Sequence, residues 1–204
     1  MGFGWFLIGY FFVSVVSVYS PLSFMMLAGY PVMVYGLWQL APYHRYLRVS
    51  FFFSLLSLPF AIYYAFYGFG AMGLGTFAFV NAAFATVEWI YFVFTLLFTA
   101  FWLFALYSLC RELGHCRLLA CALRSLIFFA MAQIFDFVAR LPIGAAAPYF
   151  ALPAILLRVI TIFLNLYFIY LCYRYICPQG EEFSHLSADA HFKKMKDTLK
   201  ENKK

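Results

Sequence analysis

Three polar residues interrupt an apolar stretch in the second half of the chain. Gln133, Asp136 and Arg140 lie in "QIFDFVARLP", residues 133–142. Their spacing of three and then four residues places them on one face of a helix. A carboxylate and a guanidinium in apolar surroundings can pair with each other or hold a charged ligand. We therefore treat this face as the leading candidate for a functional site.

Two neighbouring apolar stretches carry similar polar stripes. Arg158, Thr161 and Asn165 repeat the spacing of three and then four residues. Glu88 precedes two threonines, Thr95 and Thr99, that fall close to one stripe of another predicted helix. The sequence thus predicts three successive helices with polar faces, which could meet in the interior of one bundle.

The composition indicates the elements that must position these residues. Hydrophobic residues make up 66% of the 204 positions and charged residues only 11%, against roughly 25% charged in soluble domains. The apolar residues form runs of about 20, the length that an α-helix needs to cross a bilayer. The sequence predicts an all-α, polytopic transmembrane helix bundle in contact with lipid.

Proline, glycine and charged residues divide the chain into six predicted spans. The first two are separated only by Ser20 and Pro21, so five spans, with the first stretch as an interfacial helix, also fit. The six spans are 3–19, 22–40, 51–67, 89–109, 119–141 and 153–176.

The positions of the basic residues predict the orientation. With six spans, twelve of the fourteen lysines and arginines lie on one side, and only Arg140 and Arg158 lie on the other. The positive-inside rule then places both termini in the cytoplasm. The five cysteines fall on the same reducing side, which predicts free thiols. The basic residues do not form a stripe that would suit nucleic acid.

The charge distribution also divides the chain into two parts. Residues 1–177 form the predicted bundle, and residues 178–204 form a basic tail that holds all six lysines. Leu186, Phe192, Met195 and Leu199 roughly share one helical face within the tail. Such a segment can lie on an anionic inner leaflet, or it can remain solvated.

The expected depth of the polar residues in the membrane narrows the choice of ion-pair partners. Asp136 lies five residues before the predicted outer end of its span, and Arg158 lies five residues after the predicted start of the next. Both would sit roughly 8 Å below one boundary, and an acid there needs a partner or water. Asp136 can pair with Arg158 or with Arg140. The arrangement can lock two helices together, can be interfacial, or can hold an anionic ligand, with Glu88 balancing charge or contacting a helix N-terminus.

No known catalytic or metal motif accompanies these residues. The cluster of Cys110, His115, Cys116 and Cys121 lacks the paired spacing of structural zinc sites. No serine-hydrolase or nucleotide-binding motif is present. We therefore predict no metal and no cofactor, and an enzyme is the less favoured class. Tyrosines near span ends, such as Tyr67, fit interfacial belts.

Two short stretches carry a resemblance to known sequences. "LWQLAPYHRYLR" (37–48) and "YRYICPQGEE" (173–182) resemble segments of small, uncharacterised polytopic membrane proteins of Gram-positive bacteria. The resemblance implies a bacterial plasma membrane and assigns no activity.

The sequence supports three functional hypotheses in a definite order. The first is a transport or sensing component for a small molecule or ion, with a site in the outer leaflet. The second is a non-catalytic subunit or scaffold, in which the Asp–Arg pair is structural and the tail binds lipid or a membrane protein. The third is a membrane-embedded enzyme that modifies lipids. The ligand-binding residues predicted by the first hypothesis are Glu88, Gln133, Asp136, Arg140, Arg158, Thr161 and Asn165.

Overall fold

The computed structural model describes residues 2–15, 20–73, 78–114, 116–141 and 147–176, and every regular element in these ranges is a helix. The predicted all-α bundle is confirmed. The basic tail lies outside the described residues. The elements are α1 (Gly2–Ser14), η2 (Ser20–Met25), α2 (Met26–Leu40), η3 (Ala41–Tyr43), α3 (Arg45–Leu56), α4 (Leu58–Ala71), α5 (Ala78–Leu113), α6 (Cys116–Arg140) and α7 (Ala147–Ile176).

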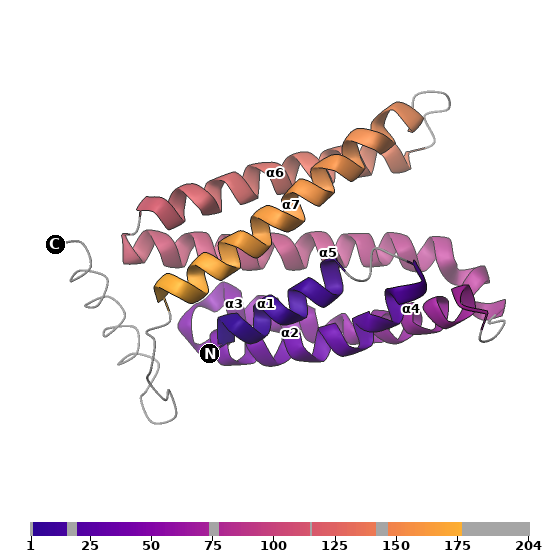
Figure 1. Ribbon diagram of the computed structural model, residues 1–204, viewed down its shortest axis with the longest axis horizontal. Coiled ribbons are helices and arrows are strands. Elements are labelled where there is room, and N and C mark those ends of the chain that lie inside the picture. The colour runs from indigo at the N-terminus through magenta and orange to yellow at the C-terminus, as the bar shows by residue number, and fades with distance from the viewer. Residues whose placement is uncertain (1, 16–19, 74–77, 115, 142–146, 177–204) are drawn as a thin grey trace.

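The described part of the chain runs along the bundle six times, and five of these passes are long and apolar enough to cross a membrane (Figure 1). Large apolar side chains such as Trp38, Ile134 and Phe163 are more than 60% exposed on these segments, which suits contact with lipid. The protein is therefore an integral membrane protein. The five segments are Leu22–Tyr43, Arg45–Ala71, Ala82–Leu113, Cys116–Arg140 and Tyr149–Ile176.

The first pass, α1, explains why the sequence allowed both six and five spans. It has 13 residues, which extend about 20 Å, whereas the hydrocarbon core is about 30 Å thick. The helix ends at Ser14, earlier than the predicted Tyr19. Its residues Phe3, Phe6 and Tyr10 are buried against the other helices.

Glycines allow α1 to pack closely against α2. Gly2 and Gly9 on α1 and Gly29 and Gly36 on α2 share a spacing of seven residues. A Cβ atom added at Gly9 would lie within 3.0 Å of the backbone of Met33, and one at Gly36 would meet the backbone of Phe6. Small residues of this kind let helix backbones approach each other in membranes.

Proline interrupts the third pass in its middle. The helices α3 and α4 are separated at Ser57, and Pro59 stands in the first turn of α4, where its missing N–H is tolerated. The Ser57 hydroxyl donates to the Phe53 carbonyl (2.8 Å) and the Ser57 N–H donates to the same oxygen. The break is thus capped locally, and the pass continues to Ala71.

The two ends of the bundle differ in charge and in packing. We call the end where α1 and α6 begin and α7 ends the basic end, since Arg45, Arg111 and Arg174 lie there. The opposite end, where α6 ends and α7 begins, we call the cavity end. In Figure 1 the basic end is on the left. The helix α7 packs against α6 and α1, and it runs diagonally across the other helices from the basic end on the left to the cavity end on the right.

Candidate functional site

The cavity-end halves of three successive helices bring the polar residues together. Glu88 and Thr95 come from α5, Gln133 and Asp136 from α6, and Arg158 from α7. Their spacings are helical, so each helix presents its polar residues on one face. All of the predicted site residues except Asp136 and Arg140 line one large cavity, and those two line a smaller one beside it.

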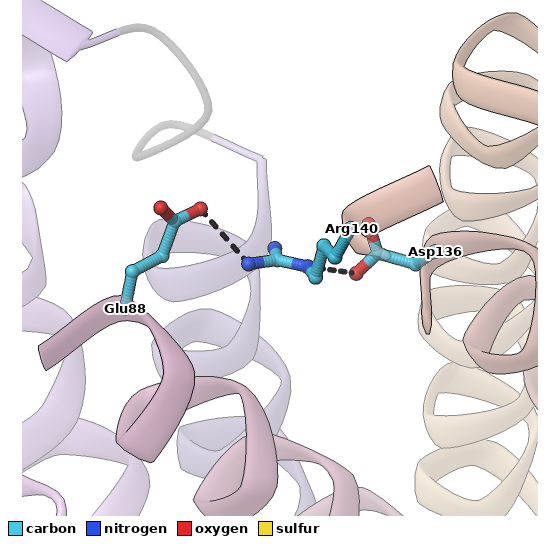
Figure 2. A network of polar contacts seen from close by, with 3 residues as sticks. All are labelled: Glu88, Asp136 and Arg140. Atoms are coloured by element: carbon cyan, nitrogen blue, oxygen red, sulfur yellow. Dashed lines mark hydrogen bonds and ion pairs between the residues drawn. The ribbon is translucent and has the colours of Figure 1, made fainter. Parts of the chain in front are cut away.

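Three of the charged residues form a continuous ion-pair network (Figure 2). The Arg140 Nη1 group donates to Glu88 Oε1 at 3.0 Å, and Arg140 Nε lies 3.4 Å from Asp136 Oδ2. The second contact is an ion pair without hydrogen-bond alignment, because Nε has no aligned acceptor. We call Glu88, Arg140 and Asp136 the triad. It joins α5 to α6 at the cavity end.

Aromatic rings support the guanidinium of the triad. The Arg140 Cζ atom lies 4.9 Å from the ring centre of Phe92 and 6.0 Å from that of Trp89. These distances suit cation–π contacts. The Arg140 side chain is 21% exposed, and those of Glu88 and Asp136 are 38% and 25% exposed. The triad is thus partly shielded and not sealed.

Arg158 is not the ion-pair partner of Asp136, although the two residues were expected at the same depth in the membrane. Asp136 pairs with Arg140, and within the described ranges Arg158 forms no ion pair with a carboxylate. The helix α7 begins at Ala147, six residues before the predicted Pro153, so distance from the predicted span ends was a poor measure of depth. Arg158 is exposed, and it lines the same small cavity as Asp136.

The small cavity has a volume of about 140 Å³. Its wall contains both carboxylates and both guanidiniums of the cavity end, together with Tyr64 and Tyr91. Side chains from α4, α5, α6 and α7 therefore surround one confined space with charges of both signs.

The large cavity has a volume of about 380 Å³, within the range of roughly 300–1,000 Å³ found for small-molecule sites. It extends from Glu88 and Arg158 to Asn165, which is fully buried. The half-length helix α1 contributes Tyr10 and Ser14 to the wall. Tyr64, Glu88, Tyr91, Thr95 and Arg158 are among the residues that line both cavities.

Several polar groups of the cavity wall have unused hydrogen-bonding capacity. The Asn165 Nδ2 group donates to the Tyr10 hydroxyl at 2.9 Å, but the Asn165 Oδ1 atom is buried without a partner. The Thr95 hydroxyl is also buried and unpartnered. Thr161 donates to the Leu157 carbonyl at 2.7 Å. An unpartnered buried polar atom costs about 1–3 kcal/mol, so the Asn165 and Thr95 oxygens make this wall less stable than an apolar one would be.

Tyrosines are the part of the site that the sequence did not reveal. The Tyr64 and Tyr91 rings meet edge to face with centroids 4.9 Å apart, and the Tyr30 and Tyr91 hydroxyls lie 3.0 Å apart. Tyr67, which was predicted to lie in an interfacial belt, lines the large cavity. The available signal was tyrosine in the middle of a span, since a buried hydroxyl needs a polar partner.

The cysteine and histidine cluster does not form a site among the described residues. Within those ranges, no group of three or more His, Cys, Asp or Glu side chains is arranged to hold a metal ion. Cys110 and Cys121 are buried and Cys116 is exposed, while His115 lies outside the described residues. The polar cavities are therefore the candidate site.

Comparison with known proteins does not indicate a function for this protein. No protein-family model, no curated protein and no solved structure matches the chain.

Proposed function

We propose that this membrane protein binds a small polar molecule in the large cavity and acts as a transport or sensing component. The observation that carries the proposal is the cavity of about 380 Å³ between membrane-spanning helices, with polar residues from three of them in its wall. Polar residues inside a membrane domain commonly mark the path or site of a substrate.

Arg158 is the group best suited to attract such a molecule. It is exposed, it lines both cavities, and it has no carboxylate partner in the described part of the chain. A guanidinium offers several fixed donors to an anionic group. The ligand is therefore expected to carry at least one anionic group.

The geometry of the triad indicates that its three residues also have a structural role, which is to join α5 to α6. An ion pair between α5 and α6 is what a scaffold function requires, and Arg140 is occupied by two carboxylates. We assign Arg140 and Asp136 to holding the cavity end together with Glu88, which also lines both cavities, and we assign the cavities to ligand binding. A non-catalytic subunit that only uses the triad for packing remains the alternative proposal.

The proposed orientation follows the positive-inside rule. The basic end would face the cytoplasm, and the cavity end would face the outer side of a bacterial plasma membrane. A solute arriving from outside would then reach Arg158 before Asn165, because both lie on α7 and Arg158 is nearer its start.

The proposal is tested by asking what the protein retains from its native membrane. The full chain is purified in native lipids, and bound small molecules are identified by mass spectrometry. The Thr95→Phe variant fills space at the wall shared by both cavities. The matched control is Ile127→Phe, at a side chain that is 57% exposed and outside the cavity lining.

We expect a small molecule that is enriched with the wild type and the control and lost from Thr95→Phe. Thermal unfolding of the three proteins in the same lipids checks that each variant is folded. An identical small-molecule profile in all three folded proteins would contradict a ligand in the cavity and would favour the scaffold alternative.

A further inference from the structure

The charges around the cavities are balanced but separated between helices. The triad contains two carboxylates and one guanidinium, which give a formal charge of −1 on α5 and α6. Arg158 on α7 contributes a charge of +1 and forms no ion pair within the described ranges. A purely anionic ligand would meet Arg158 favourably but would also face the excess negative charge of the triad.

The negative part of the wall is also the aromatic part. Glu88 lines both cavities together with Tyr64 and Tyr91, whose rings meet edge to face at 4.9 Å. Tyr67 and Phe84 add a stacked pair with centroids 5.0 Å apart in the large cavity. Tyrosine rings next to a carboxylate are the environment that binds organic ammonium groups, through cation–π and ionic attraction.

The positive part of the wall has the complementary chemistry. Arg158 stands on the same face of α7 as Thr161 and Asn165, and all three line the large cavity. The unpartnered Asn165 Oδ1 atom is completely buried there. An anionic group held by Arg158 would be close to further polar groups, and no carboxylate pairs with Arg158 in the described part of the chain to compete for it.

We propose that the ligand of the cavity is a zwitterion, with its anionic group at Arg158 and its ammonium group among Tyr64, Tyr91 and Glu88. This inference rests on the proposed function and names the chemical class that the same site takes. A zwitterion satisfies both parts of the wall at once, whereas a simple anion or cation satisfies one and is opposed by the other.

Two sources can supply this chemistry. One is a free solute that carries a carboxylate or phosphate and an ammonium. The other is the headgroup of a zwitterionic phospholipid that enters between the helices from the bilayer. Both present the same two charges, and the experiment separates them by using soluble and lipid probes in different arms.

The soluble arm uses three probes of similar shape. Glycine betaine carries both charges, choline keeps the quaternary ammonium without the carboxylate, and 3,3-dimethylbutanoate keeps the carboxylate and replaces the ammonium by a neutral carbon. Binding is measured by isothermal titration calorimetry on the full chain in nanodiscs of phosphatidylglycerol, which has no zwitterionic headgroup. We expect betaine to bind at least about ten-fold more tightly than the other two probes.

The lipid arm uses the same nanodiscs with phosphatidylcholine added to the phosphatidylglycerol. Native mass spectrometry then counts retained phosphatidylcholine relative to phosphatidylglycerol. Retention of phosphatidylcholine without betaine binding supports the headgroup as the zwitterion, and betaine binding supports the free solute.

Variants of the cavity wall test whether the anionic group and the ammonium group of the ligand bind at the proposed residues. Arg158→Gln should weaken binding of the retained zwitterion by about ten-fold, while Arg124→Gln, an exposed arginine of α6 outside the cavities, should leave it unchanged. Tyr91→Leu should weaken binding several-fold through loss of the ring. Tyr91→Phe keeps the ring and should retain most of the affinity, which a role limited to the Tyr30–Tyr91 hydrogen bond would not predict.

The outcomes distinguish this inference from the proposal beneath it. Equal affinity for betaine and 3,3-dimethylbutanoate, or for betaine and choline, overturns the zwitterion and leaves a ligand-binding cavity. Zwitterion binding that is unaffected by Arg158→Gln also overturns it. If neither betaine nor phosphatidylcholine binds, the zwitterion is wrong; the proposed function fails as well only if the co-purified molecules are indifferent to Thr95→Phe.

Discussion

The basic half and the cavity half of the bundle consist of the same helices but differ in how closely the side chains pack. Toward the basic end, α5 and α7 bury large apolar side chains such as Trp102, Leu106 and Phe168 completely or nearly so. Toward the cavity end, the same two helices expose Glu88 and Arg158 to open space. A ligand-binding site in a helix bundle therefore requires a region where the side chains of neighbouring helices do not fill the space between them.

The length of α1 accounts for much of this difference. Its 13 residues fill the basic half of the bundle and end at Ser14, beside the large cavity. In the basic half, Phe6 and Tyr10 of α1 pack edge to face on Trp102 at 5.4 and 5.6 Å. Next to Ser14, polar side chains of α5, α6 and α7 line the large cavity.

The largest effect should come from closing the tightest contact of the basic half. Gly9→Ala would place a Cβ atom against the backbone of Met33, which cannot move aside cheaply. We expect a loss of stability of about 3 kcal/mol, the upper part of the usual range for overpacking, since the added Cβ strains two helices. Thermal unfolding in lipid nanodiscs measures it.

Gly4→Ala is the matched control on the same helix. Its Cβ would lie 3.5 Å from the Tyr173 ring, an ordinary contact, and should change stability by less than about 1 kcal/mol. Equal losses in the two variants would show that the close approach of α1 and α2 is not what holds the basic half together.

A cavity made in the basic half should cost more than one made in the cavity half. Leu106 is 1% exposed, and Leu106→Ala should destabilise the protein by about 3 kcal/mol. Thr99→Ala, on the same helix but in the wall of the existing cavity, should cost less than about 1 kcal/mol. The same unfolding measurement compares them, and a reversed order would mean that the cavity half is packed as closely as the basic half.

The two arginines of the cavity end should respond differently to loss of charge. Arg140→Gln leaves Glu88 and Asp136 without their shared cation, and should cost about 1 kcal/mol at these partly exposed positions. Arg158→Gln breaks no ion pair within the described residues and should cost less than about 0.5 kcal/mol. Unfolding measurements on the single variants and on Glu88→Gln with Arg140→Gln give the coupling energy. A coupling energy of zero between Glu88 and Arg140 would show that the triad does not stabilise the contact between α5 and α6.

The smallest expected effect lies at the basic end, outside the spans. Burial and then Arg45 lower the pKa of His44 below its ordinary value, while Glu112 opposes them. The unfolded chain therefore binds more protons near the ordinary pKa of about 6.5, so stability should fall as pH drops through 6.5 toward the lowered pKa. We expect less than about 0.5 kcal/mol, because the ring is not fully buried.

His44→Asn is the control for this titration. It keeps a side-chain acceptor for the Tyr46 N–H, which His44 Nδ1 holds at 3.3 Å, and it removes the titrating ring. Unfolding temperatures at pH 7.5 and 5.5 should then differ less for the variant than for the wild type. An equal pH dependence of the unfolding temperature in both proteins would show that a titrating side chain other than His44 causes it.

The sequence was sufficient for features that depend on local composition. Apolar runs predicted the long helices, and the spacing of Gln133, Asp136 and Arg140 predicted one polar face, because both follow from helix geometry alone. The choice of Arg140 over Arg158 as the partner of Asp136 did not follow. It depends on Glu88, 52 residues away from Arg140 in the chain, and on how α7 crosses its neighbours.

The parts that sequence reasoning missed depend on packing between distant segments. The helix α1 ends at Ser14, before proline or charge signals an end. The role of Tyr64 and Tyr91 arises only when α4 and α5 lie side by side. Neither feature leaves a periodic pattern that a single sequence displays.

Water accessibility along α5 tests the contrast between the two halves most directly. In a background with the native cysteines replaced by alanine, Thr99→Cys lies in the cavity wall and Ala105→Cys lies at a completely buried position of the basic half. The two positions are about 9 Å apart on one helix. We predict that a small, charged thiol reagent labels Thr99→Cys in the folded protein and leaves Ala105→Cys unmodified. An unlabelled Thr99→Cys, or equal labelling at both positions, would contradict the contrast between an open cavity half and a closely packed basic half.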